Sequence, residues 1–287
     1  MANGIGKIDL HMHTTVSDGT DTPEKIIDAV RAAGISCFAV TDHDSFKSAT
    51  IIPKLIGEDL NFIPGIEFSC KDELGKYHIL GYGFDTNGEA IRQVVEKGHG
   101  FRMKKVVDRL DFLKTTFGIS FPDEEIKDLL ALDNPGKPHI GNLMVKYGFA
   151  ATKEEAINEY INKVHFKNEY VRPEEAISGI LASGGIPVLA HPFYGSGGEL
   201  ILGEEMDERL RRLIGFGLQG IEAFYSGFTA KLRESALKFA EKYDLYVTAG
   251  SDYHGTNKLV ELGDTGLDDM PEYPAGLRRF LNIVIDK

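Results

Sequence analysis

Histidine and carboxylate side chains recur at or near the ends of short apolar runs in this sequence, a placement that suits metal binding. His11 and His13 close the first such run. Residues i and i+2 of a strand share a face, so both imidazoles can reach one ion. Imidazole and carboxylate ligands without a thiolate are typical of Mn²⁺, Zn²⁺ or Fe²⁺ sites. The other candidate ligands associated with these runs are Asp18, His43, Glu67, His78, His191, Asp252 and His254.

Each histidine also has a simpler interpretation, because a single histidine at a strand end is more often hydrogen-bonded in the rim or core than bound to a metal. The convergence of many such ends is what favours a metal centre. His99 and His165 lie outside the pattern and are assigned solvated or structural roles by default. Asp42 either holds His43 or is a simple loop acid. Glu222 ends a strand without a ligand role, and either supports the ligands or orients substrate.

The elements that position these side chains alternate between strands and helices. Near-continuous apolar runs favour strands buried on both faces, as in a parallel sheet. The expected strands are 7–11, 36–42, 61–68, 77–84, 186–190, 220–225 and 245–250, and the expected helices between them are 23–33, 173–183, 204–216 and 229–242. The short spacing between 61–68 and 77–84 indicates a hairpin. The sum predicts an α/β barrel of about seven strands, whose carboxyl ends open on one face, where barrel active sites lie.

One long segment interrupts this alternation. Residues 86–172 contain no convincing strand, and their pattern predicts helices at 88–116, 122–132, 138–147 and 152–162. So long a helical segment inside one barrel connection is too large for a loop. We therefore expect a discontinuous barrel domain, 1–85 and 173–287, with residues 86–172 as an inserted helical subdomain that packs firmly against it.

The composition limits the classes of partner. The chain has 287 residues, 32 Lys+Arg against 44 Asp+Glu and a net charge of −12, which argues against binding to duplex DNA. No apolar run approaches the ~18 residues of a membrane span, and no secretory signal is visible. Two cysteines, Cys37 and Cys70, fit a reducing compartment. The expected location is cytoplasmic, with no membrane association and no evident obligate protein partner.

The motifs resemble those of a known family, the polymerase and histidinol phosphatase (PHP) metallohydrolases. HMH, SDG, TDHD, GIEFS, AHP and SDYHG match in order over most of the chain. The resemblance implies a distorted (β/α)7 TIM-like barrel with a trinuclear centre, and it tilts the metal assignment toward Mn²⁺ over Zn²⁺ or Fe²⁺. It implies that one ion is held by His11, His13, Glu67 and Asp252, a second by Asp18, His43 and His254, and a third by Glu67, His78 and His191.

The helical insert makes one subfamily look most similar, and its members hydrolyse nucleotide phosphates, including 3′,5′-bisphosphates, while some trim RNA from the 5′ end. We therefore expect a phosphoesterase that uses a metal hydroxide in an in-line attack on phosphorus, with Glu67, Asp252 and His191 in the catalytic site. The expected substrate is a small phosphorylated nucleotide or a short RNA. A histidinol-phosphate-type phosphatase remains an alternative, and a non-catalytic nucleotide-binding sensor remains another.

Substrate selection is expected to depend on the insert. Lys137 and His139 lie in a Gly-Lys-Pro-His stretch at a predicted helix start, which resembles the family's Arg-Pro-His motif and suits an anion. For His139, helix capping is an equal alternative. Arg172 is a weaker substrate-binding candidate, and for Arg102 a surface salt bridge is the preferred interpretation. The aromatic residues with a possible role in base stacking are Phe193, Tyr194, Tyr225 and Tyr253.

Overall fold

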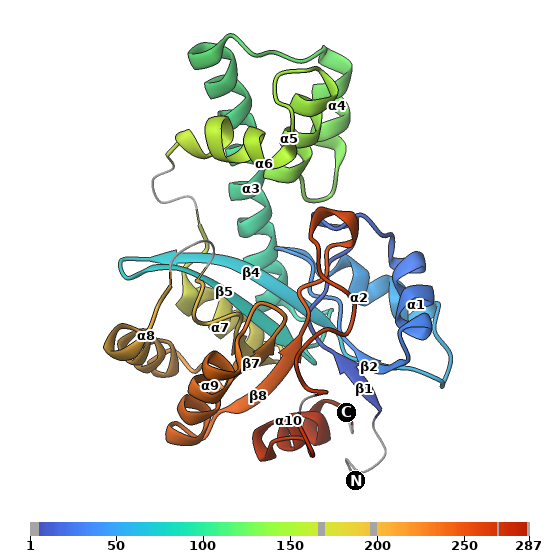
Figure 1. Ribbon diagram of the computed structural model, residues 1–287, viewed down its shortest axis with the longest axis vertical. Helices are drawn as coiled ribbons and strands as arrows, with labels where there is room; N and C mark the ends of the chain where they lie inside the picture. Colours follow the sequence, from blue (N-terminus) through green and yellow to red (C-terminus); the bar gives the residue numbers. More distant parts are fainter. Residues whose placement is uncertain (1–5, 166–169, 196–199, 269, 286–287) are drawn as a thin grey trace.

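The computed structural model describes residues 6–165, 170–195, 200–268 and 270–285 (Figure 1). The strands are β1 (Lys7–Asp9), β2 (Ile35–Phe38), β3 (Asn61–Phe62), β4 (Gly65–Asp72), β5 (Gly75–Tyr82), β6 (Ile186–Leu189), β7 (Gly220–Tyr225) and β8 (Tyr246–Gly250). The α-helices are α1 (Pro23–Ala32), α2 (Lys47–Ile51), α3 (Glu89–Phe117), α4 (Asp123–Ala131), α5 (Lys137–Lys146), α6 (Lys153–Glu155), α7 (Pro173–Ala182), α8 (Gly203–Gly215), α9 (Ala230–Lys242) and α10 (Ala275–Ile285).

The strands form two sheets rather than one continuous closed ladder. Strands β1, β2 and β3 make a parallel sheet, and β4 to β8 make a second sheet in chain order. The expected strand 61–68 divides into β3 and β4, with Pro64 between them, because proline has no N–H to donate to a ladder. The sheets are joined by single bridges, Met12 to Tyr253 and His43 to Glu67. The fold is therefore α/β as predicted, without a regular seven-stranded barrel among the described residues.

The hairpin prediction is confirmed, and it changes where one candidate ligand lies. Strands β4 and β5 pair antiparallel from Gly65 opposite Tyr82 to Asp72 opposite Gly75, and β5 is also antiparallel to β6. Gly75 has φ of +141°, a conformation that favours glycine in the tight turn. Because β5 is reversed, His78 reaches the site from the first half of its strand. The expectation that candidate ligands come from carboxyl ends does not hold for this residue.

Helix boundaries follow the local signals in the sequence. The Thr22 hydroxyl accepts a hydrogen bond from the Lys25 amide, and Pro23 takes the first helical position of α1. The long helix α3 ends at Gly118, whose φ is +69°. Helix α10 was not predicted from the sequence, although Leu277, Phe280, Leu281 and Val284 form a buried face at helical spacing. Within the described ranges, no helix combines the length and apolar character needed to cross a membrane.

Three apolar cores underlie the two parts seen in Figure 1, and one of them, which includes Ile26 and Phe38, lies between α1 and β2. We call residues 86–172 the insert and the remaining described residues the body. The largest core lies in the body, between the sheets and their flanking helices. A separate core, which includes Val106, Leu113 and Met144, lies in the insert. The first half of α3 packs on α7, where a Cβ on Gly179 would lie 2.7 Å from Val94 Cγ2, so α3 connects both parts.

Candidate metal centre

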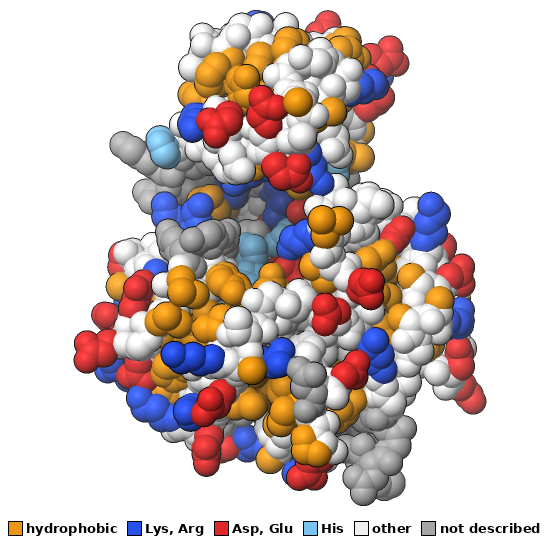
Figure 2. Space-filling view, viewed as in Figure 1, with side chains coloured by type: hydrophobic (Ala, Val, Ile, Leu, Met, Phe, Trp, Pro, Cys, Tyr) orange, Lys and Arg blue, Asp and Glu red, His pale blue; other side chains and the backbone are white. Residues whose placement is uncertain are grey.

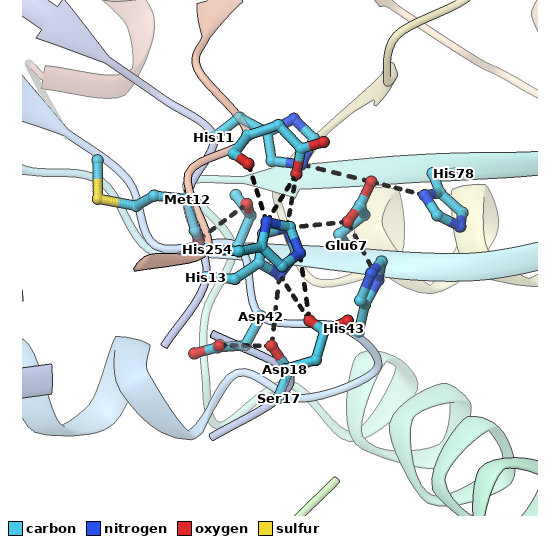
Figure 3. A network of polar contacts seen from close by, with 12 residues as sticks. His11, Met12, His13, Ser17, Asp18, Asp42, His43, Glu67, His78 and His254 are labelled. Carbon is cyan, nitrogen blue, oxygen red and sulfur yellow. Dashed lines mark hydrogen bonds and ion pairs between the residues drawn. The ribbon is translucent and has the colours of Figure 1, made fainter. Parts of the chain in front are cut away.

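The carboxylate of Glu67 lies at the centre of the histidine cluster (Figure 3). It is carried by β4 and its side chain is 1% exposed. Its Oε1 lies 2.9 Å from His78 Nδ1, 3.3 Å from His191 Nε2 and 3.4 Å from His11 Nε2. Its Oε2 lies 3.1 Å from His43 Nδ1 and 3.2 Å from His13 Nε2. One buried carboxylate thus faces imidazoles from many parts of the chain, a geometry suited to a bridging ligand.

Two aspartates extend the cluster away from Glu67. Asp252 Oδ1 lies 3.5 Å from His11 Nε2 and 3.4 Å from His13 Nε2, and Asp18 Oδ1 lies 3.3 Å from His254 Nε2. Three groups of donor atoms lie within 4.8 Å of one another. They are His13, Asp18, His43 and His254; His11, His13 and Asp252; and His43, Glu67 and His78. These overlapping buried groups fit a multi-metal site.

Unsatisfied polar atoms in this cluster point to the same conclusion. Within the described residues, His11 Nε2, His13 Nε2, His43 Nδ1 and Asp18 Oδ1 are buried and make no hydrogen bond. A buried polar atom left in this state costs roughly 1–3 kcal/mol. Imidazole nitrogens and carboxylate oxygens are ordinary ligands of divalent transition metals, and both cysteines are buried free thiols. The side chains present therefore fit a set of bound divalent cations.

Glu222 supports two of the candidate ligands from behind. Its Oε1 lies 2.9 Å from His11 Nδ1, and its Oε2 accepts a hydrogen bond of 2.7 Å from the His191 amide. A carboxylate on Nδ1 holds the proton there and leaves Nε2 free to bind a metal. This answers the question that the sequence left open for Glu222: it lies behind the ligands and supports them.

Asp42 supports a different histidine from the one expected. Its carboxylate accepts hydrogen bonds from the Thr14 amide at 2.8 Å and from the Ser17 hydroxyl at 2.7 Å. Ser17 Oγ in turn lies 3.3 Å from His13 Nδ1. Asp42 therefore fixes the loop beside His13 rather than holding His43. Of the two interpretations left open for Asp42, a supporting role therefore fits, with His13 as the histidine concerned.

Backbone strain concentrates at the same cluster. His191 and Asp252 have φ of +27° and +58°, values that L-residues rarely adopt. Such strain persists where the surrounding structure imposes it, and it is common at functional sites. Gly250 shows how close the packing is, because a Cβ there would lie 2.1 Å from His11 Cβ. The positions of the candidate ligands are thus imposed by the fold.

Electrostatics keep the carboxylates ionised. Burial alone raises the pKa of Glu67, but His78, His43 and His11 hold that pKa well below its usual value. Burial likewise opposes ionisation of Asp252, yet Lys258 and His11 bring its pKa well below the ordinary range. Burial lowers the pKa of His43 well below its usual value and leaves the imidazole neutral. Ionised carboxylates and a neutral His43 are the protonation states that metal binding requires. At His11 and His13 burial lowers the pKa, but the surrounding carboxylates outweigh it and raise the pKa, to about 9 for His13, so a bound metal would displace protons from these two imidazoles.

A cavity of about 270 Å³ lies beside the cluster, bounded by both the body and the insert. Asp18, His43 and His78 line one side of it. Figure 2 shows this hollow, with histidine and cationic side chains inside it. Its cationic side chains, which we call the basic wall, are Lys76, Arg102, Lys105, Arg109 and Lys137. The metal-ligating cluster and a concentrated positive charge therefore face the same space.

Helix α3 supplies much of the basic wall. The expectation of a surface salt bridge for Arg102 is wrong in its location: Arg102 pairs with Asp44 at 2.6 Å, but its side chain is only 12% exposed and lines the cavity. Lys105 lies 3.9 Å from the Tyr170 ring centroid. Burial, and then Arg102, lower the pKa of Lys105 to about 7. Sequence reasoning missed Lys105 and Arg109, although their i, i+3, i+7 spacing from Arg102 marks one helix face.

The remaining substrate-binding candidates have different positions in the structure. Lys137 lines the cavity, its Nζ donates to Asn162 Oδ1 at 2.6 Å, and burial lowers its pKa to about 8. His139 Nδ1 accepts from the Gly136 amide at 3.0 Å, which is the helix-capping alternative. Arg172 is 45% exposed, pairs with Glu174 at 3.0 Å and does not line the cavity.

The aromatic candidates make other contacts. The Tyr225 hydroxyl donates to Asp252 Oδ2 at 3.1 Å, and the Tyr253 hydroxyl donates to Asp21 at 2.7 Å. The Tyr194 hydroxyl donates to the Gly227 carbonyl, and Phe193 is buried against Phe228. Within the described part of the chain, Tyr170 is the aromatic residue that lines the cavity. No motif in the sequence pointed to Tyr170.

An α/β fold with overlapping His, Asp and Glu clusters beside a basic cavity defines a metal-binding hydrolase architecture. The chain belongs to the PHP domain family, whose model matches residues 9–175. It is a phosphoesterase hydrolase of that family. It is 30% identical over 268 residues to a 5′-3′ exoribonuclease of Haemophilus influenzae, covering 90% of this chain and 93% of the relative.

Other relatives act on different phosphate esters. The chain is 29% identical over 267 residues to a phosphoribosyl 1,2-cyclic phosphate 1,2-diphosphodiesterase of Eggerthella lenta, covering 86% of this chain and 94% of the relative. It is 25% identical over 260 residues to a 3′,5′-nucleoside bisphosphate phosphatase of Chromobacterium violaceum, covering 87% and 88%. A structure from Bifidobacterium adolescentis, of a protein proposed to be a metal-dependent phosphoesterase, is 26% identical with a TM-score of 0.79 and covers 96% of this chain and 95% of that one.

Proposed function

We propose that this phosphoesterase releases the 3′-phosphate of nucleoside 3′,5′-bisphosphates and also acts on short RNA with a 5′-phosphate. The observation that carries the proposal is the basic wall, which faces the metal-ligating cluster across one cavity. Bound cations suffice to hold the phosphate under attack. The additional Lys and Arg side chains match a second phosphate on the same molecule.

The metal-binding part of the proposal uses three divalent ions, most simply Mn²⁺. The first is assigned to His11, His13, Glu67 and Asp252, the second to Asp18, His43 and His254, and the third to Glu67, His78 and His191. Glu67 is assigned as the bridge because its two oxygens face imidazoles on both sides. When bound, such ions polarise phosphoryl oxygens and supply a hydroxide nucleophile near neutral pH.

The protein's own residues then bind and orient the substrate. Arg102, Lys105 and Arg109 project from one face of α3, and Lys76 and Lys137 come from β5 and α5. A phosphate held by this wall fixes the distance to the cluster, so an ester phosphate on the same ribose is presented to the metal side. Positioning of this kind supplies a large part of enzymatic rate enhancement.

Base recognition contributes little in this proposal. Tyr170 is the aromatic residue lining the cavity within the described chain, and Lys105 lies over its ring. A cavity wall that binds phosphates and offers few surfaces for a base is compatible with substrates that carry different nucleobases.

His191 is assigned a role as ligand and not as proton donor, because its Nε2 faces Glu67.

A substrate panel tests the proposal. Purified protein with Mn²⁺ is offered adenosine 3′,5′-bisphosphate, AMP, histidinol phosphate, phosphoribosyl 1,2-cyclic phosphate and a 5′-phosphorylated oligoribonucleotide, and phosphate and nucleotide release are measured. We expect the highest kcat/KM for the bisphosphate, with detectable release from the oligoribonucleotide. Faster turnover of histidinol phosphate or of the cyclic phosphate overturns the choice of substrate. Metal binding with no turnover of any compound supports the sensor alternative.

A further inference from the structure

Asn257 joins two loops that each carry a candidate metal ligand. It lies at the end of a short 3-10 helix, Gly255–Asn257, that follows β8. Its Nδ2 donates to the Asp18 carbonyl at 2.7 Å, and its amide donates to the His254 carbonyl at 3.3 Å. Asp18 and His254 belong to one group of donor atoms. One residue, through its side-chain amide and its backbone N–H, therefore joins the main chain of both candidate ligands.

The same two loops are packed too closely to move independently. The Thr20 amide donates to the His254 carbonyl at 3.2 Å, and the Thr256 amide donates to Thr20 Oγ1 at 2.9 Å. Gly255 has φ of +63°, and a Cβ there would lie 2.0 Å from Thr20 Oγ1. A displacement applied at Asn257 is thus transmitted to the loop that carries Asp18.

Lys153 reaches Asn257 from the insert. Its Nζ donates to Asn257 Oδ1 at 2.8 Å and to the Asn257 carbonyl at 3.2 Å. Its aliphatic stem lies against α5, where a Cβ on Gly141 would be 3.1 Å from Lys153 Cγ. Helix α5 begins at Lys137, a member of the basic wall. Lys153 therefore contacts both the helix that carries a wall residue and the residue that links two ligand loops.

We propose that Lys153 and Asn257 are positioning residues that couple the basic wall to the metal site formed by Asp18, His43 and His254. The inference rests on the proposed function for its metal assignment. We call the contact of Lys153 Nζ with Asn257 the clasp, closed when its hydrogen bonds are formed. With the clasp closed, the ammonium group polarises the Asn257 amide and strengthens its bond to the Asp18 carbonyl, since hydrogen bonds in a chain reinforce one another. Breaking the clasp frees α5 from the ligand loops.

Such coupling has a reciprocal consequence. If an anion on the wall favours the closed clasp, and the closed clasp favours metal binding at Asp18 and His254, then each ligand strengthens binding of the other by the same factor. The outcome is an enzyme that holds its metal at that position most tightly when a phosphate occupies the wall.

An exposed ion pair between insert and body provides a matched control for the Lys153–Asn257 contact. Lys47, on α2, pairs with Asp133 at 2.6 Å, and both side chains are about half exposed, 51% and 47%. This pair also crosses from body to insert and also contains one lysine. Within the described residues, neither side chain hydrogen-bonds the loops that carry Asp18 and His254. Removing Lys47 deletes the same charge without touching the clasp.

Equilibrium binding of Mn²⁺ to the full chain tests the inference, with metal content measured after dialysis at graded free Mn²⁺, with and without inorganic phosphate. We expect Lys153→Ala and Asn257→Ala to weaken binding of one ion about 10-fold or more, the usual effect of losing an outer partner of a ligand. Lys47→Ala should bind as the parent does, and Lys153→Arg should recover much of the loss. The gain in Mn²⁺ affinity on adding phosphate should be smaller in Lys153→Ala than in Lys47→Ala.

Kinetics separate positioning from a general loss of structure. At subsaturating Mn²⁺, Lys153→Ala should lose activity, and saturating Mn²⁺ should restore kcat while leaving KM raised. If Lys153→Ala and Lys47→Ala have equal Mn²⁺ affinities, and phosphate raises both affinities equally, the proposed coupling through Lys153 and Asn257 is wrong. Absence of Mn²⁺ binding by the parent chain contradicts the proposed metal centre instead, so the two failures are distinguishable.

Discussion

The metal-ligating cluster and the basic wall face one cavity but are built in opposite ways. The cluster comes from strands and strand ends of the body, where Glu67 is 1% exposed and His191 and Asp252 are held at positive φ. The wall comes mainly from one face of α3 and the start of α5 in the insert. The comparison indicates two separate roles: the body positions the candidate metal ligands, and the insert supplies most of the cationic side chains that would bind the substrate.

Removing the bridge should have the largest effect. We predict that Glu67→Ala loses more than one metal ion and lowers kcat by about 10³-fold or more, because bound metals supply several kcal/mol of transition-state stabilisation. Metal analysis and phosphate release measure both. Glu58→Ala, at an exposed position, is the control and should match the parent. Retention of most activity in Glu67→Ala would falsify the bridging assignment.

Replacing Glu222, which hydrogen-bonds two of the candidate ligands, should have the second-largest effect. We predict that Glu222→Gln lowers Mn²⁺ affinity about 10- to 100-fold, since His11 Nδ1 and the His191 amide lose a charged acceptor. The change preserves the volume of the side chain and keeps an oxygen acceptor. Titration with Mn²⁺ measures the loss, and unchanged affinity would mean that Glu222 has only a packing role.

A change in the wall should affect binding rather than chemistry. We predict that Lys105→Met raises KM for a nucleoside bisphosphate about 10- to 100-fold, because hydrogen bonds to charged groups contribute roughly 1.5–3 kcal/mol. Its Mn²⁺ content should equal that of the parent. A large fall in kcat with unchanged KM would break the proposed division between cluster and wall.

The wall should also respond to pH. Because burial and Arg102 bring the pKa of Lys105 to about 7, its ammonium form predominates below pH 7 and is lost as pH rises above it. Anion binding should therefore weaken from pH 7 to 8, seen as a fall in kcat/KM of several-fold, about the factor expected for one charge. The profile for Lys105→Met should lose the part of this limb centred near pH 7 and keep the part due to Lys137, whose pKa burial lowers to about 8. Identical profiles would assign the titration to another group.

The smallest effect is expected outside the cavity. We predict that Arg172→Ala leaves KM within about 2-fold of the parent, because exposed ion pairs such as Arg172–Glu174 contribute roughly 0–1 kcal/mol. Lys137→Ala, which removes a wall residue, should raise KM clearly in the same assay. If Arg172→Ala raised KM more than Lys137→Ala did, the bound substrate would have to extend out of the cavity as far as Arg172, which would contradict this account.

The same comparison explains what the sequence could predict. The candidate ligands follow strands in short motifs, so their convergence was predictable from local pattern, and the structure brings them together. The wall was harder to predict because charged residues on a helix are usually solvated, and the burial of Lys105 depends on how the insert lies against the body. The support by Glu222 was left open, since it joins residues far apart in sequence. The predicted seven-stranded barrel is not found among the described residues, because Pro64 divides one expected strand and the reversed β5 interrupts the parallel order.

The most direct test of the account compares two substrates that differ by one phosphate. Adenosine 3′,5′-bisphosphate and adenosine 3′-monophosphate present the same ester to the cluster, but the second has nothing for the wall to hold. We predict a kcat/KM for the bisphosphate about 100-fold higher in the parent chain, consistent with two charge-assisted hydrogen bonds, and a ratio about 10-fold smaller, or lower still, when Lys105 and Lys137 are both replaced by Met while Lys76, Arg102 and Arg109 remain. Equal kcat/KM for the two substrates in the parent chain would contradict the claim that the wall binds a second phosphate.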